Sequence, residues 1–356
     1  MQREDNMFEK PFEISGRRIG PREPCFVIAE AGVNHNGSLS MAFELIDAAA
    51  TAGADAVKFQ TFCVEQLMAP DTPTADYQKA NTDEASQFEM LRKLELSRDD
   101  HVQLMQYCRK KELLFLSTPF EEKSAGLLAS LDVPAFKIPS GEIPNIPFLS
   151  HVARFGKPMI VSTGMCGLGE VETAVRAIQN SGDVPLALLH CVSAYPADPA
   201  TVNLRAMETL SHAFGLPVGF SDHTRGLAVP AAAVALGATI IEKHFTLSRN
   251  LAGPDHLASL EPDELVDLVE TIRSVESAMG DGQKVAVSCE ANTAEVARKS
   301  LVAAVDITAG AILSKDIIAI RRPGTGLSPA MLPFVVNRTA VSDIRAGTVL
   351  RMEDVA

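Results

Sequence analysis

The chain has 356 residues, of which 46% are hydrophobic and 22% are charged, and its formal net charge at pH 7 is −13. This composition is typical of a folded globular protein and excludes a disordered, collagen-like or coiled-coil chain. The acidity argues against general nucleic-acid binding, which needs clustered lysine and arginine. It leaves open an anionic small substrate that is bound by a few cations in a cleft.

The sequence predicts neither a targeting nor a membrane segment. The first ten residues are charged and lack the apolar core of a secretory signal. The longest nearly apolar run, Ala228 to Ile241, is too short to span a bilayer and contains Pro230. The six cysteines show no C-x-x-C pair and no zinc spacing. We therefore expect a cytoplasmic protein with reduced thiols, and neither nucleic acid nor membrane among its partners.

Short apolar or β-branched runs alternate with helical segments over the first 280 residues. A hairpin is predicted at Phe12–Ile19, where it would cover the bottom of the fold. The predicted strands are Phe26–Glu30, Ala56–Gln60, Leu113–Ser117, Ala135–Ser140, Met159–Ser162, Leu186–His190, Val218–Ser221 and Ile240–His244. The predicted helices are Met41–Gly53, one that begins at Ser97, Glu170–Asn180, Leu204–Phe214, Gly226–Leu236 and Glu261–Met279.

This alternation predicts βαβ units and a parallel sheet. Eight such units in about 250 residues match a (β/α)₈ TIM barrel. An open Rossmann sheet is the second interpretation, but the first strand is followed by Glu30-Ala-Gly-Val-Asn-His-Asn-Gly37 and not by G-x-G-x-x-G. The connection from about Thr61 to Ser97 is long, which indicates a functional loop or small extra helices.

The pattern changes near Met279, where Gly280-Asp-Gly-Gln283 indicates a turn or linker. We expect a barrel domain at 1–280, a linker at 281–290 and a small β-rich domain at 291–356. Its apolar segments are short, such as Leu301–Val305, Ile317–Ile320 and Val335–Val336, and glycine and proline residues separate them. Asp306-Ile-Thr-Ala-Gly310 and Asp343-Ile-Arg-Ala-Gly347 form a weak internal repeat, which indicates two related turns.

Polar residues lie near the carboxyl end of nearly every predicted strand, where a barrel keeps its active site. They are Glu30, Lys58, Gln60, Thr118, Lys137, Ser140, Glu142, Ser162, Tyr195, Ser221, His223 and His244. Each has a structural alternative, such as a turn hydroxyl, a core histidine or a strand lysine paired with Glu242. Burying all of them without compensation would cost several kcal/mol each, so a solvated polar pocket is favoured.

The content of this pocket indicates its ligands. Lys58 and Lys137 supply two cations, and neighbouring hydroxyl groups supply donors, a set that suits a phosphate. His223 and His244 end neighbouring strands and could converge on Mn²⁺ or Mg²⁺. Glu30 could act as a general base, or it could be a structural partner of a strand lysine.

Several longer motifs point to one family. They are Ile28-Ala-Glu-Ala-Gly-Val-Asn-His-Asn-Gly37, Val57-Lys-Phe-Gln-Thr-Phe62, Ser117-Thr-Pro-Phe120, Lys137-Ile-Pro-Ser-Gly-Glu142, Ser162-Thr-Gly164, Gly219-Phe-Ser-Asp-His-Thr224 and Glu242-Lys-His-Phe-Thr246. In this order they resemble the N-acetylneuraminate (sialic acid) synthase family, which includes legionaminate and pseudaminate synthases. The C-terminal part, with Arg322-Pro-Gly-Thr-Gly-Leu-Ser-Pro329, resembles that family's SAF (antifreeze-like) domain.

The resemblance implies a reaction between phosphoenolpyruvate (PEP) and the aldehyde of an N-acetylated mannose-type sugar, which gives a nine-carbon 2-keto acid and phosphate. It also implies a divalent metal, Mn²⁺ or Mg²⁺, and a homodimer that swaps its C-terminal domain.

The resemblance further assigns roles to individual residues. PEP would be held by Lys58, Thr118, Lys137, Ser140, Ser162 and Ser221. His223 and His244 would bind the metal, and Glu30 would be the base, toward water or in handling the sugar. The sugar would face Gln60, Glu142, Tyr195, Asp255 and, from the partner subunit, Arg322.

More than one sugar substrate and more than one reaction class are compatible with the sequence. The loop from Leu251 to Pro262 resembles legionaminate-type synthases, whose sugar is 2,4-diacetamido-2,4,6-trideoxymannose, more than N-acetylmannosamine-using enzymes. Ala31-Gly-Val-Asn34 is less similar to the pseudaminate branch. Other interpretations are a Schiff-base aldolase with Lys58, Lys137 or Lys243 as nucleophile, and a non-catalytic sugar- or ice-binding protein.

Overall fold

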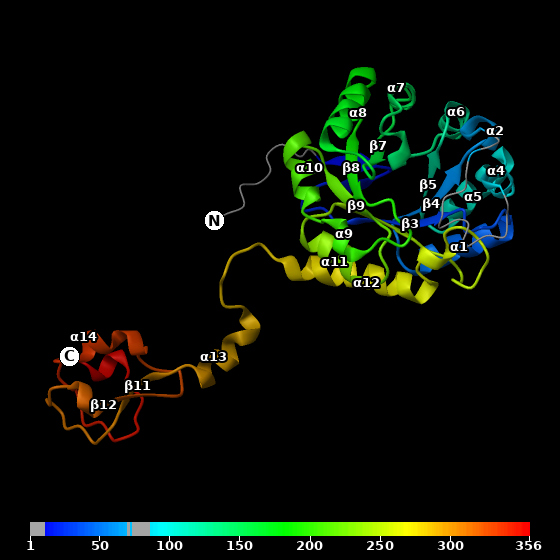
Figure 1. The fold of residues 1–356 in the computed structure, drawn as a ribbon. Helices are drawn as coiled ribbons and strands as arrows, with labels where there is room; N and C mark the ends of the chain where they lie inside the picture. Colours follow the sequence, from blue (N-terminus) through cyan, green and yellow to red (C-terminus); the bar gives the residue numbers. More distant parts are fainter. Residues whose placement is uncertain (1–10, 70–71, 73–85) are drawn as a thin grey trace. The chain divides into compact units, whose positions relative to one another are not determined.

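The structure is a computed structural model that describes residues 11–69, 72 and 86–356 of the chain. The chain divides into two units, residues 1–281 and 282–356 (Figure 1), and each has its own hydrophobic core. Within the described residues no helix is both long and apolar enough to span a bilayer.

The first unit is built on a parallel sheet with the order β5-β4-β3-β10-β9-β8-β7-β6. Since β5 and β6 are consecutive in the chain and adjacent in space, the sheet curls into a nearly closed barrel with helices outside (Figure 1). The strands are β3 (Phe26–Gly32), β4 (Ala56–Thr61), β5 (Leu114–Pro119), β6 (Phe136–Ile138), β7 (Met159–Ser162), β8 (Leu186–Cys191), β9 (Val218–Asp222) and β10 (Ile240–His244). The predicted TIM barrel is confirmed.

The helices of this unit follow the strands in alternation. They are α1 (Leu39–Thr51), α2 (Val64–Leu67), α4 (Gln87–Arg92), α5 (Arg98–Lys110), α6 (Glu122–Ser130), η1 (Ser140–Glu142), α7 (Ile146–Ala153), α8 (Leu168–Ser181), α9 (Pro199–Val202), α10 (Ala206–Phe214), α11 (Ala228–Ala235), η2 (His256–Ala258) and α12 (Pro262–Met279). Ser97 begins α5 with a capping box to Asp100, as its position before two acidic residues indicates.

The long connection before Ser97 contains small helices in its described part, α2 and α4. Residues 70–71 and 73–85 of this connection lie outside the described residues. The expectation of extra helices is therefore confirmed for the part that the structure describes.

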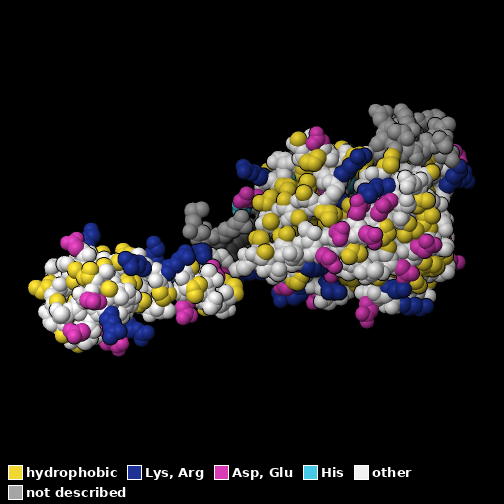
Figure 2. Space-filling view, turned by 90° about the horizontal axis from the view of Figure 1, so that it is seen from below, with side chains coloured by type: hydrophobic (Ala, Val, Ile, Leu, Met, Phe, Trp, Pro, Cys, Tyr) yellow, Lys and Arg dark blue, Asp and Glu magenta, His cyan; other side chains and the backbone are white. Residues whose placement is uncertain are grey.

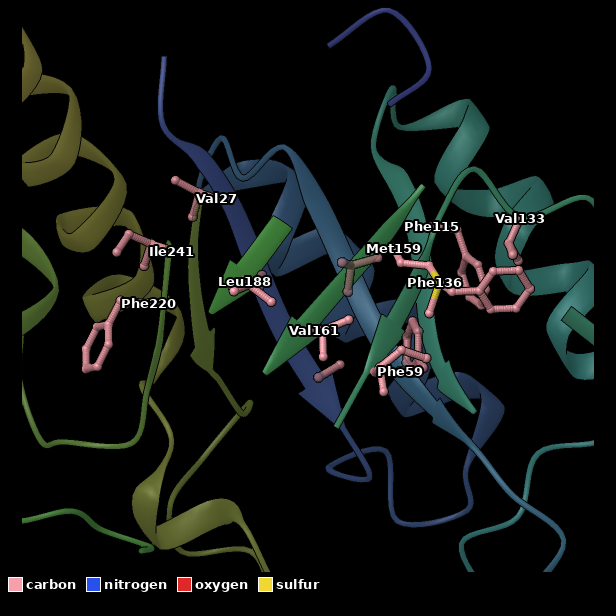
Figure 3. Close-up of a cluster of buried hydrophobic side chains, with 14 of the residues drawn as sticks. Val27, Phe59, Phe115, Val133, Phe136, Met159, Val161, Leu188, Phe220 and Ile241 are labelled. Carbon is pink, nitrogen blue, oxygen red and sulfur yellow. The ribbon is translucent and has the colours of Figure 1, made fainter. Parts of the chain in front are cut away.

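Alternation along the strands divides the barrel core into two layers. Outward side chains such as Val27, Leu188 and Phe220 pack between the strands and the helices (Figure 3). Inward side chains such as Ile28 and Ile240 fill the lower barrel. The predicted hairpin is confirmed as β1 (Phe12–Ile14) paired antiparallel with β2 (Arg17–Ile19), and its Ile14 and Ile19 belong to this inward layer. The polar site therefore lies above a closed apolar floor.

The second unit is small and contains few regular elements. It has η3 (Ser288–Glu290), α13 (Ala291–Ala297), β11 (Ser300–Ala303), η4 (Lys315–Ile317), β12 (Ile318–Arg321), η5 (Pro329–Met331), α14 (Leu332–Val335) and η6 (Met352–Asp354). Of the short apolar segments of this unit, Val335–Val336 lies at the end of a helix, because Val335 is the last residue of α14. Ser328 begins this helical stretch by accepting a hydrogen bond from the backbone N–H of Ala330.

The internal repeat has a structural basis. Ile307 and Ile344 exchange two backbone hydrogen bonds, each 2.8 Å. The Asp306 carboxylate accepts from the N–H of Ala346, and the Asp343 carboxylate accepts reciprocally from Ala309, each at 2.8 Å. The two similar sequences therefore pair with each other around a local pseudo-twofold axis.

Candidate active site

The candidate residues of the first unit lie at the carboxyl ends of the barrel strands. Ile28 and Ile240 point into the barrel, so Glu30, two residues after Ile28, and Glu242 and His244, two and four after Ile240, point the same way. This register places a layer of polar side chains directly above the apolar floor of the barrel.

Lys58 connects three neighbouring strands. Its Nζ lies 2.8 Å from the Glu30 carboxylate on β3 and donates to the Thr118 hydroxyl on β5 at 2.8 Å. Gln60, two residues further along β4, donates to Glu30 at 3.4 Å. The Lys58 and Glu30 side chains are both less than 5% exposed. The structure therefore brings these four predicted residues together, with Glu30 in an ion pair.

Glu242 is the central anion of the cluster, whereas the sequence indicated it only as a structural partner of a strand lysine. Its carboxylate lies 3.7 Å from Lys58 Nζ and 3.4 Å from Lys137 Nζ. It also accepts from the Ser221 hydroxyl at 2.9 Å. Its position two residues before His244 was the available signal, since both side chains then point into the barrel.

The two carboxylates of the cluster have opposite pKa shifts. Burial raises the pKa of Glu30 to about 7, despite the opposing charge of Lys58. Burial also acts to raise the pKa of Glu242, but Lys137 and Lys58 outweigh it and lower that pKa to about 2. Glu242 is thus a permanent counter-ion, while Glu30 can exchange a proton near neutral pH.

The lysines also differ from each other. Burial alone would lower the pKa of Lys58, but Glu242 and Glu30 together raise it. For Lys137, burial dominates over the attraction of Glu242 and lowers the pKa. Both ammonium groups already face carboxylates, so an arriving anion would compete with those carboxylates for them.

Several hydroxyl groups lie at or just after the carboxyl ends of β6, β7 and β8, and that of Ser162 contacts Lys137. Lys137 donates to Ser162 at 2.8 Å, and Ser140 accepts from the backbone N–H of Gly164 at 2.9 Å. A Cβ at Gly164 would lie 2.5 Å from the Ser193 hydroxyl and 2.9 Å from that of Ser140. Glycine at 164 therefore lets the backbone approach this group of hydroxyls closely.

The two predicted metal-ligating histidines lie side by side. Their ring centroids are 5.4 Å apart, and the Tyr195 ring is 4.1 Å from His223 and 5.8 Å from His244. His223 Nδ1 donates to the carbonyl of Val192 at 2.8 Å, so in the neutral ring Nε2 keeps its lone pair. Within the described residues the buried Nδ1 of His244 has no hydrogen-bond partner.

The remaining predicted sugar-binding residues lie in different places. Asp255 is buried in the loop after β10, where burial raises its pKa to about 6 against the opposing charges of His223 and Lys58. Glu142 is half-buried in η1 and accepts from Asn145 at 2.6 Å. Arg322 is exposed and follows β12 in the second unit.

A separate group with metal-ligand atoms lies in the long connection after β4. The ligand atoms of Cys63, Glu65 and Glu95 lie within 4.8 Å of one another. Cys63 donates to Glu65 at 3.3 Å, and Glu95 accepts from the Val64 N–H at 2.6 Å. These groups are used in the loop's own hydrogen bonds, and we assign no metal to them.

A parallel barrel with lysines, carboxylates and histidines clustered inside its carboxyl end defines the class of this protein as a TIM-barrel enzyme. The sequence matches the NeuB family over residues 45–284 and the SAF domain over residues 298–356. The chain belongs to the NeuB family and carries a C-terminal SAF domain, as the resemblance of its motifs predicted.

Individual relatives cover nearly the whole chain. The N,N'-diacetyllegionaminic acid synthases of Legionella pneumophila and Campylobacter jejuni are each 46% identical, over 96% and 91% of this chain and 99% and 98% of their own. The N-acetylneuraminate-9-phosphate synthase of Homo sapiens is 37% identical over 87% of this chain and 88% of its own. The crystal structure of the sialic acid synthetase of Leptospira borgpetersenii is similar with a TM-score of 0.71, at 34% identity over 80% of this chain and 95% of that one.

Proposed function

We propose that the chain is a nonulosonic acid synthase that condenses PEP with the open-chain aldehyde of an N-acetylated mannose-type sugar. The observation that carries this proposal is the pair of buried lysines, Lys58 and Lys137, set among carboxylates and hydroxyl groups beside two histidines. PEP carries a phosphate and a carboxylate, and two cations with hydroxyl donors match these groups.

The proposed reaction balances with one water. A carbon–carbon bond forms between C3 of PEP and the aldehyde carbon, whose oxygen takes a proton. Water adds to C2 of PEP and loses a proton, and the C2–O bond to phosphate then breaks as the 2-keto group forms. The products are a nine-carbon 2-keto acid and inorganic phosphate.

The barrel residues divide the handling of PEP among them. Lys58 and Thr118 on one side, and Lys137, Ser140 and Ser162 on the other, would hold its anionic groups, with Ser221 beside Glu242. Glu30 would accept the proton of the attacking water, because its raised pKa matches a base that works near neutrality. Lys58 and Gln60 hold the Glu30 carboxylate in place for this proton transfer.

The histidines fit a divalent cation. Two ring nitrogens are suitable ligands: Nδ1 of His244, which is buried and has no hydrogen-bond partner among the described residues, and Nε2 of His223. Water and substrate oxygens would complete the coordination of Mn²⁺ or Mg²⁺. Such an ion, when bound, polarises the aldehyde as a Lewis acid. The Val192 carbonyl fixes the orientation of the His223 ring for this task.

The sugar would lie between the metal-binding histidines and the outer loops. Gln60, Glu142, Tyr195 and Asp255 are its proposed contacts in the barrel. We propose that Arg322 reaches the N-acetyl group from the partner subunit, in a homodimer that exchanges its SAF domains. This arrangement gives a separate small domain a role in a barrel site.

Among the candidate sugars we favour 2,4-diacetamido-2,4,6-trideoxymannose, which gives N,N'-diacetyllegionaminate, over N-acetylmannosamine. Higher identity to the two legionaminic acid synthases than to the human N-acetylneuraminate-9-phosphate synthase supports this choice. A pseudaminate-type reaction is the alternative. A cytoplasmic location is supported by the six free cysteines, of which Cys25, Cys108 and Cys191 are buried.

Phosphate release from PEP tests the proposal. We expect release only with a suitable sugar, fastest with the 2,4-diacetamido sugar, and we expect it to stop with a chelator and return with Mn²⁺. The panel also contains N-acetylmannosamine and the pseudaminate precursor. Trapping of pyruvate on Lys137 by borohydride, with no need for PEP, would instead establish the Schiff-base aldolase.

A further inference from the structure

The loop after β3 holds the loop after β10 through a buried asparagine. Asn34 is 1% exposed, and its Nδ2 donates to the carbonyl of Phe245 at 2.8 Å and to the Ser259 hydroxyl at 3.0 Å. Ser259 in turn donates to the backbone carbonyl of Asp255 at 2.7 Å. Two consecutive hydrogen bonds therefore connect Asn34 with the backbone of a proposed sugar-binding residue.

A second connection brackets Asp255 from the other side. Asn36 Nδ2 donates to the carbonyl of Ala252 at 3.0 Å, and its Oδ1 lies 3.1 Å from Nε2 of His256. Because Asn36 Oδ1 can only accept, Nε2 of His256 carries the proton, and its Nδ1 accepts from the Thr246 hydroxyl at 2.7 Å.

Gly253 makes this close approach between the two loops sterically feasible. It has φ +154°, and a Cβ there would lie 2.7 Å from Cδ2 of His256 and 2.9 Å from Oδ1 of Asn36. Residues on both sides of Asp255 are thus held from one neighbouring loop, while its buried side chain lies close enough to interact with the charges of His223 and Lys58.

We propose that Asn34, Asn36 and Ser259 are positioning residues that set the place of the Asp255 carboxylate and, through it, the binding of the sugar. This rests on the proposed function, in which Asp255 contacts the sugar. The physical reason is that Asp255 lies in an irregular loop, so side-chain hydrogen bonds from the β3–α1 loop replace the support that a strand would give. Small displacements of such a group reduce its interaction with the substrate.

The test compares Ser259→Ala and Asn36→Ala with the matched variant Thr239→Ala. Thr239→Ala also removes a side-chain hydrogen bond to a backbone carbonyl, the one that Thr239 donates to Val218 at 3.1 Å. Thr239 precedes β10, at the end of the strand away from the site. We expect Ser259→Ala and Asn36→Ala to raise the KM for the sugar about three- to tenfold, the effect of one or two lost hydrogen bonds, with the KM for PEP unchanged. Thr239→Ala should leave both constants unchanged. Asn36 is only partly buried, so its variant remains informative if a change at the buried Ser259 prevents folding.

A double-mutant cycle with Asp255→Ala separates positioning from a general structural effect. In the Asp255→Ala background, Ser259→Ala should have no further effect on the KM for the sugar, because the carboxylate it positions is absent. Equal effects of Ser259→Ala with and without Asp255 would overturn the inference, as would an unchanged sugar KM in both the Ser259 and Asn36 variants.

The same measurements distinguish this inference from the proposed function. If Asp255→Ala raises the sugar KM while the positioning variants behave like Thr239→Ala, only the inference fails. An unchanged sugar KM in Asp255→Ala would remove the sugar-binding role of Asp255, and the inference with it. If no sugar in the panel releases phosphate from PEP in the unaltered chain, the proposed function itself fails.

Discussion

Glu30 and Glu242 share the ammonium group of Lys58, yet they are suited to different roles. Glu242 also faces Lys137 and Ser221, so its negative charge is matched on several sides and persists. Glu30 has Lys58 and a long hydrogen bond from Gln60, and burial raises its pKa. Removing one partner of such a buried pair costs about 3–5 kcal/mol. Single substitutions of these charged residues therefore alter stability together with chemistry, and an uncharged neighbour provides a cleaner test.

Gly32 is that neighbour. It lies at a bulge in the pairing of β3 with β4, with φ +54°, and a Cβ there would lie 3.3 Å from Glu30 Oε1, 3.4 Å from Gln60 Nε2 and 3.6 Å from His244 Cε1. We expect Gly32→Ala to lower kcat/KM for phosphate release by roughly 10-fold, because the methyl group crowds the Glu30 carboxylate, while its contacts with Gln60 and His244 are ordinary van der Waals contacts.

The control for this prediction is Gly156→Ala. Gly156 has φ +70° and no heavy atom within 4 Å of an added Cβ, so it has the same backbone strain without the crowding. Both variants should lose about 1 kcal/mol of unfolding free energy from the left-handed conformation. Equal activity of the two variants would show that the space beside Gly32 is not used in catalysis.

At the scale of elements, the hairpin β1–β2 contributes to the stability of the barrel without contacting the proposed substrates. Ile19 is fully buried in the inward layer beneath the polar cluster. We expect Ile19→Ala to lower the unfolding free energy by about 2–5 kcal/mol through the cavity it creates, with the KM values for PEP and sugar unchanged. Chemical denaturation measures the first and steady-state kinetics the second.

The comparison variant for the hairpin is Leu236→Ala. Leu236 is 49% exposed beside α11, so it should change the unfolding free energy by no more than about 0.5 kcal/mol. A comparable loss in both variants would mean that the hairpin does not close the barrel core.

The sequence allowed the strands to be predicted more completely than the helices. The strands are uninterrupted apolar runs that end in polar residues, and this signal is local. Helices α6 and α7 were missed, because α6 contains Gly126 and α7 begins at Ile146-Pro147, shortly after Pro144. Periodicity is weak in segments this short. The SAF domain was recognised by its motif, although its isolated β-bridges give almost no periodic pattern.

The candidate site was predictable only where strand alternation decides it. Glu30, Lys58 and His244 follow from their place in the strand pattern. The central position of Glu242 does not, because it depends on three strands that are far apart in the sequence. The support of Asp255 by Asn34 is likewise a contact over more than 200 residues, for which no local pattern exists.

At the scale of the whole molecule, the net charge of −13 describes the surface and not the site. Acidic and basic side chains are interspersed on the face shown in Figure 2. The buried cluster instead holds Lys58 and Lys137 among Glu30 and Glu242. An anionic substrate is therefore recognised by local cations, and weak global repulsion would be screened beyond about 8 Å at physiological salt.

Buried neutral histidines make the barrel sensitive to acid. His35 and His256 are both fully buried, and burial lowers the pKa of each to about 4 from 6.5. Because the folded pKa lies below the unfolded one, the unfolded state binds more protons between pH 6.5 and 4. Stability is complete above pH 6.5 and falls by up to about 3 kcal/mol per histidine as the pH drops through this window.

Urea denaturation at pH 7.5 and pH 5 measures this dependence. The near-ultraviolet signal of tyrosine reports on the barrel, since all three tyrosines precede residue 281. His35→Asn keeps an acceptor for the N–H of Gly37, which His35 Nδ1 accepts at 3.0 Å. This variant should lose less stability between the two pH values than the unaltered chain. An identical loss would exclude His35 as a source of the acid sensitivity.

The proposed exchange of SAF domains predicts that two inactive variants restore activity to each other in a mixed dimer, which a site formed within one subunit would not do. If Arg322 acts on the partner's barrel, Arg322→Ala and Glu30→Gln inactivate a site through different chains of the dimer. A hybrid dimer then contains one site with both residues intact and one site with neither. Mixing the two inactive variants after mild dissociation should restore about a quarter of the unaltered activity, because half of the dimers are hybrids with one functional site each. Phosphate release measures the recovery, and size-exclusion chromatography shows that dimers have re-formed. Absence of recovery in re-formed dimers would place Arg322 on its own barrel or outside the reaction.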